Sequence, residues 1–111
     1  MAQKTGFAWD AVTTNTDGSA VNGPVVYEVH FGTSSKNYTS KIGNIPSTTE
    51  PISAVLSSQP DGLYYVAVDA IDVFGTSSGY SNEVQVLKVG TGFFVQNPAE
   101  IPAAPGNLVL T

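Results

Sequence analysis

Pro-Asp-Gly-Leu-Tyr-Tyr-Val-Ala-Val-Asp-Ala, residues 60–70, is the stretch that decides the fold. A Pro-Asp-Gly turn signal leads into a run in which Tyr64, Val66, Val68 and Ala70 occupy alternate positions. Successive side chains of a strand point to opposite faces, so this alternation predicts a strand over residues 63–71 with one buried face.

The same period of two recurs on the N-terminal side of this strand. It predicts strands over residues 4–12 and 24–32, and shorter runs predict strands at 37–42, 52–57 and 83–89. Turn clusters rich in Gly, Asp, Asn and Ser separate the runs, and no helical spacing persists over eleven residues or more. The chain is therefore predicted to be all-β, a sandwich or a small barrel. The predicted core comprises Phe7, Trp9, Tyr27, Val29, Phe31, Tyr64, Val66 and Val68.

These residues together resemble a fibronectin type III domain of the bacterial and phage kind. The resemblance rests on Trp9, on Tyr-x-Val-x-Phe at 27–31, on the 60–70 stretch and on Tyr-Ser-Asn-Glu-Val at 80–84, and it covers about residues 5–89. It implies an immunoglobulin-like β-sandwich with Trp9 on the second strand. It also implies that Ser-Asn-Glu-Val opens the last strand.

The chain departs from this family pattern at its start. Trp9 lies so close to Met1 that we expect no room for the family's first strand. A proline-rich lead and a short apolar run of the expected form occur instead at residues 101–110. We therefore predict a sandwich over residues 1–89 that lacks its usual first strand, followed by a linker and a candidate donated strand over 90–111.

Two interpretations of this C-terminal arm stay open. It is either the start of a further tandem domain or an unstructured tail, or else it pairs with a sheet edge and supplies the absent strand. Pairing within one molecule and pairing between molecules are both compatible with the length of the linker. The predicted partner-binding residues of the arm are Leu108, Val109 and Leu110.

Phe93, Phe94 and Val95 form a second apolar cluster, bounded by Gly92 and Pro98. The cluster either caps the end of its own sandwich or anchors a contact between neighbouring molecules, where buried aromatic residues contribute much of the binding energy. We include it among the predicted partner-binding residues.

Composition narrows the classes of function. The chain has 111 residues, no cysteine, a net charge of −5 and only 12% charged residues, and its four lysines are scattered. These features argue against nucleic-acid binding and exclude disulfides and thiolate metal sites. No apolar run approaches the roughly 20 residues of a membrane span, and residues 1–6 contain no stretch of signal-peptide length. We therefore expect no membrane insertion and a virion or extracellular location.

Reactive groups are sparse. His30 is the only histidine, and alternation puts it on the outer face of its strand. No motif for a nucleophile or an oxyanion hole accompanies the many serines, so we expect no enzymatic activity, no cofactor and no resident metal. A set of carboxylates is interpreted as solvated turn residues rather than as calcium ligands: Asp10, Asp17, Asp69, Asp72 and Glu83.

The expected function is that of a non-catalytic structural module. It would be a subunit of a phage virion or extracellular filament, a homo-oligomer linked by strand exchange through the C-terminal arm, with other virion or surface proteins as further partners. The alternative is a binding or spacer module of a secreted bacterial polysaccharide-degrading enzyme.

Overall fold

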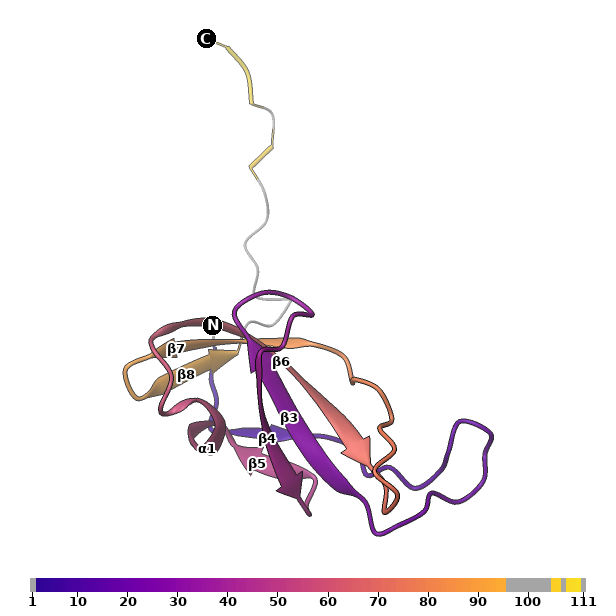
Figure 1. Cartoon of the computed structure of the whole chain (residues 1–111). Coiled ribbons are helices and arrows are strands. Elements are labelled where there is room, and N and C mark those ends of the chain that lie inside the picture. The colour runs from indigo at the N-terminus through magenta and orange to yellow at the C-terminus, as the bar shows by residue number, and fades with distance from the viewer. Residues whose placement is uncertain (1, 96–104, 107, 111) are drawn as a thin grey trace.

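Two antiparallel sheets make up the fold in the computed structural model, which describes residues 2–95, 105, 106 and 108–110 (Figure 1). The larger sheet has six strands in the order β1-β8-β7-β6-β3-β4, and the smaller has two, β2-β5. Over the described residues the chain is all-β with one short helix, an arrangement compatible with a β-sandwich. The elements are β1 Ala2–Gln3, β2 Gly6–Ala8, β3 Val26–Gly32, β4 Ser40–Ile45, β5 Thr49–Pro51, α1 Ile52–Leu56, β6 Gly62–Ile71, β7 Val84–Val89 and β8 Gly92–Val95.

The core lies on the inner face of the large sheet. In the central pair of strands, β3 and β6, Val29 stands opposite Val68 and Phe31 opposite Val66. Five of the predicted core residues are buried, and the other three pack against them while remaining partly exposed. The buried ones are Tyr27, Val29, Phe31, Tyr64 and Val66, and the partly exposed ones are Phe7, Trp9 and Val68.

The strand predicted at 52–57 is wrong, because these residues form the helix α1 after β5 ends at Pro51. Ile52, Val55 and Leu56 are at most 2% exposed, and their spacing of three and four places them on one side of a single helical turn. The helix thus inserts three apolar side chains into the core. The strand predicted at 37–42 lies later in the chain, as β4.

Residues 90–95 differ from the predicted linker, because β7 and β8 form a hairpin within one sheet. Phe93 stands opposite Lys88 and is 7% exposed, and Phe94 stands opposite Leu87. Gly90 has a φ of 59°, a value that glycine adopts without steric cost, and this permits the tight turn. The predicted boundary at residue 89 therefore falls inside a hairpin, and Phe93 belongs to the core of its own domain.

The N-terminal residues also differ from the expectation that no strand precedes Trp9. Ala2 and Gln3 form β1, which pairs with β8, and the Lys4 backbone N–H donates to the carbonyl of Phe93 over 2.8 Å. This first strand joins the large sheet, so it adds nothing to the small one. Within the described residues, no helix has the length and apolarity required to cross a membrane.

Candidate functional site

The strand β2 has one edge without a strand partner among the described residues. On its other side it pairs with β5, where the Thr5 carbonyl accepts from Ile52 and the Trp9 N–H donates to Thr48, both over 3.0 Å. Backbone groups alternate in direction along an antiparallel strand, so the N–H and C=O groups of Gly6 and Ala8 turn toward the free edge. This edge can pair with one further strand.

A groove of about 730 Å³ runs along this free edge. Its floor includes the inward-facing residues Val66 and Val68 of β6 and Val84 of β7. Val66 is 1% exposed, whereas Val68 and Val84 are only half-buried. The two strands of the small sheet therefore leave part of the inner face of the large sheet uncovered.

The segment 78–82 forms the opposite wall of the groove. It is held to β6 by serine residues: Ser78 Oγ accepts from the Ala70 N–H over 2.9 Å, and Ser81 Oγ accepts from the Val68 N–H over 3.0 Å. Their own backbone N–H groups donate to the carbonyls of the same two residues. This stretch of β6 is thus already hydrogen-bonded, and β2 provides the edge that remains open.

Trp9 connects the groove with the core. Its ring meets Tyr27 edge-on with centroids 5.5 Å apart, and the Tyr27 hydroxyl accepts from the Val12 N–H. Trp9 Nε1 is buried and, within the described part of the chain, has no hydrogen-bond acceptor. Leaving a buried donor unpaired costs about 1–3 kcal/mol.

The predicted partner-binding residues fall into two groups. Phe93, Phe94 and Val95 lie in β8 and pair with β7 of the same molecule. Leu108 and Leu110 are fully exposed and Val109 is 68% exposed, in the C-terminal part drawn in yellow in Figure 1. Three consecutive exposed apolar side chains offer a surface that can be buried against another surface.

The carboxylates considered for calcium binding do not come together. Asp17 accepts from Ser19, Asp72 accepts from the N–H groups of Phe74 and Thr76, and Glu83 binds the loop after β3. Asp69 is 5% exposed, so its interpretation as a solvated turn residue is wrong. In the described residues, just one group of three potential ligands converges, and it consists of Glu28, His30 and Asp69.

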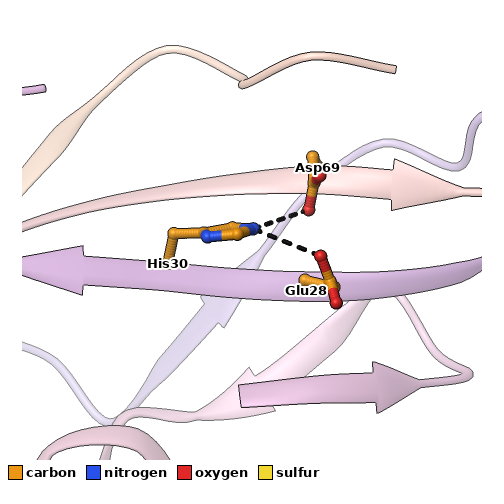
Figure 2. Close-up of side chains that lie close together, drawn as sticks. All are labelled: Glu28, His30 and Asp69. Carbon is orange, nitrogen blue, oxygen red and sulfur yellow. Dashed lines mark hydrogen bonds and ion pairs between the residues drawn. The ribbon is translucent and has the colours of Figure 1, made fainter. Parts of the chain in front are cut away.

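This group lies on the outer face of the large sheet, on the central strands β3 and β6 (Figure 2). His30 Nε2 lies 2.9 Å from Asp69 Oδ1 and 3.4 Å from Glu28 Oε1. The sequence located His30 on this face but missed Glu28. Alternation does put residues 28 and 30 on one face, yet the register that brings Asp69 opposite Glu28 is not visible in the sequence.

Glu83 fastens the loop after β3 to the start of β7. The Ser35 hydroxyl, the Lys36 N–H and the Tyr38 hydroxyl all donate to its carboxylate, over 2.6, 2.7 and 2.8 Å. These bonds, led by that from Ser35, lower the pKa of Glu83. Burial and the bond to Glu83 raise the pKa of Tyr38 to about 12.

Replacing Glu83 by glutamine is expected to destabilise the protein slightly at neutral pH and to have no effect in acid. A carboxylate with a lowered folded pKa contributes its full stability above its ordinary value of 4.5, and this contribution disappears as the pH falls through the lower folded value. Urea unfolding of both proteins at about pH 7 and about pH 3 measures the difference. An equal difference at both pH values contradicts the role of the charge, and Glu50→Gln is the control.

Comparisons with models of known protein families, with curated proteins and with solved structures found no match.

Proposed function

We propose that this chain is a structural module of the fibronectin type III kind that assembles by donating its C-terminal strand to the groove of another copy. The strand order β7-β6-β3-β4 facing β2-β5 is the order of strands G-F-C-C′ facing B-E in such sandwiches. The Tyr64 hydroxyl donates to the carbonyl of Pro60 at the start of β6, as does the tyrosine corner of immunoglobulin-like folds. Both features support the family assignment.

The observation that carries the assembly is the open edge of β2 beside a half-covered apolar floor. In sandwiches of this kind the strand preceding B occupies such a place, next to B and over the core. The exposed apolar run Leu108-Val109-Leu110 can supply two leucine side chains to one face of such a strand. Strand addition of this type gains main-chain hydrogen bonds for affinity and alternate side chains for register.

The side chains of the arm divide between two faces once it is extended. Leu108 and Leu110 point the same way, roughly 7 Å apart, and would cover Val68 and Val84 on the floor. Val109 would point outward, beside the bare backbone of Gly6 and the short side chain of Ala8. The backbone of the arm would then pair with the free N–H and C=O groups of those two residues.

Donation between copies makes a heterologous contact, because the arm and the groove are different surfaces of one molecule. Such a contact repeats from one copy to the next and produces rings or open filaments. We place this assembly in a phage virion or an extracellular filament, in keeping with a surface that has few charges and many Ser, Thr and Asn residues.

Disulfide trapping tests the pairing directly, since the chain contains no cysteine of its own. Val109→Cys is mixed under mild oxidation with Gly6→Cys, Ala8→Cys or Asp10→Cys, each a separate protein. Outward-facing residues on neighbouring strands lie within disulfide reach, so at least one mixture should give a covalent heterodimer. Ser58→Cys, exposed and outside the groove, is the matched control.

The outcomes separate the possible occupants of the groove. A heterodimer with a β2 cysteine and none with the control supports donation between copies. A single chain carrying both cysteines that closes on itself, with no heterodimer in the mixtures, shows that the arm fills its own groove. Equal, slow cross-linking of all the variants means that the arm has no docking place, and the proposal fails.

A further inference from the structure

We propose that Glu28, His30 and Asp69 form a binding site for one divalent transition-metal ion, and that Zn²⁺ is the ion whose ligand preferences these residues match. The site lies on the outer face of the large sheet, and none of its three residues lines the groove. The three side chains come from the central strands β3 and β6, which have neighbours on both sides, so the sheet holds them in place.

The backbone register brings two like charges together. Glu28 and Asp69 are directly opposed across β3 and β6, and their side chains are only 17% and 6% exposed. Opposed carboxylates in a poorly solvated position repel each other. A dication between them would replace this repulsion by attraction.

The donor atoms converge as a metal requires. Glu28 Oε1, His30 Nε2 and Asp69 Oδ1 lie within 4.8 Å of one another. The distance from Nε2 is 3.4 Å to Glu28 Oε1 and 2.9 Å to Asp69 Oδ1. A tetrahedral Zn²⁺ with ligands at about 2.0–2.2 Å holds its donor atoms roughly 3.3–3.6 Å apart. Small side-chain rotations therefore suffice, and Zn²⁺ would take the position of the proton on Nε2.

The second oxygen of each carboxylate accepts a hydrogen bond from a neighbouring side chain. Lys41 Nζ donates to Glu28 Oε2 over 3.0 Å, and Ser77 Oγ donates to Asp69 Oδ2 over 2.6 Å. One oxygen of each residue is thereby fixed and the other is turned toward the imidazole (Figure 2). Metal sites in proteins use such outer hydrogen bonds to orient their ligands.

Aromatic rings orient the imidazole. Tyr80 packs edge-on against His30 with ring centroids 4.9 Å apart, and Tyr38 packs in turn against Tyr80 at the same distance. The His30 side chain is 11% exposed. A mixed set of one imidazole and two carboxylates suits Zn²⁺, whereas Ca²⁺ and Mg²⁺ prefer oxygen ligands alone.

Nuclear magnetic resonance of the untagged, EDTA-dialysed full chain tests the site without any substitution. His30 is the only histidine, so its imidazole signals report on this position alone. We expect Zn²⁺ to shift them with saturation at one equivalent, and Mg²⁺ and Ca²⁺ to leave them unchanged. Unchanged imidazole signals at about 1 mM Zn²⁺ would overturn the proposal, because the dissociation constant would then be well above about 1 mM.

Calorimetric titration of variants supplies the second test. His30→Gln and Glu28→Gln should each weaken Zn²⁺ binding at least about tenfold, while Asp17→Asn, which alters an exposed carboxylate elsewhere, should bind as the wild type does. Circular dichroism establishes that each variant is folded. The assignment would be contradicted if His30→Gln bound Zn²⁺ as tightly as the wild type, or if Asp17→Asn weakened binding as much as the site variants do. If a variant does not fold, the imidazole signals of the wild type alone decide whether the site exists.

Discussion

Replacing Leu108 and Leu110 together by aspartate is expected to abolish self-association of the protein. Both side chains are fully exposed, and docking in the groove would bury both against Val68 and Val84. Burying one leucine contributes about 1.5–3 kcal/mol, so losing two weakens the association constant by about 10²–10⁴-fold. Burial of the new carboxylates without partners weakens it further. Sedimentation velocity or light scattering over a concentration series measures the effect.

Val109→Asp is the matched control for this experiment. Residue 109 would face outward from the docked strand, so a single aspartate there should leave association within a few fold of the wild type. Circular dichroism spectra should be the same for all three proteins, because the substituted residues lie outside the core. Their thermal unfolding should agree at concentrations low enough for the wild type to be monomeric. A wild-type protein that stays monomeric at every concentration contradicts the proposed assembly. Equal loss in Val109→Asp shows that apolarity matters but strand alternation does not.

Replacing Leu56 by alanine is expected to remove a large part of the stability of the fold. Leu56 is 0% exposed, and it belongs with Ile52 and Val55 to the apolar side of α1. Truncating a buried leucine to alanine costs about 2–5 kcal/mol through lost burial and the cavity that is left. The free energy of unfolding of a domain of this size is about 5–15 kcal/mol in total. The midpoint of thermal unfolding should therefore fall by more than about 10 °C.

Urea denaturation gives the free energy of unfolding for this comparison. The midpoint should fall while the slope stays the same, because the surface exposed on unfolding hardly changes. Ser53→Ala, on the exposed side of the same helix, should change stability by less than about 0.5 kcal/mol. Similar stability of Leu56→Ala and the wild type would show that α1 does not complete the core.

Two of the strands with strong alternation could be predicted from the sequence to within two residues, whereas the run predicted at 4–12 forms a strand only over Gly6–Ala8, as β2. The segments 24–32, 63–71 and 83–89 correspond to β3, β6 and β7, because a buried face imposes its period of two locally. The helix α1 could not be predicted in this way. It makes a single turn, and its three apolar residues become helical because they fit the core there.

The candidate sites depended on contacts between distant segments. Leu108 and Leu110 could be singled out because a proline-rich lead and a short apolar run resemble the family's first strand, but the open groove beside β2 could not. Phe93 was expected in a linker, and the hairpin with β7 puts it in the core. Glu28 was missed because its significance comes from Asp69, which lies far along the chain and meets it only across the sheet.

By itself the sequence determined that this chain is all-β, which side chains of the central strands face inward, and where the main turns lie. Only the tertiary structure decided which edges are paired, namely that β1 joins β8 and that, among the residues the structure describes, β2 has a free edge over an uncovered floor. The physical reason is that period and turn preference are local properties of the chain. Strand neighbours and register are instead chosen by hydrogen bonds and packing between distant segments, which a pattern of alternation does not specify.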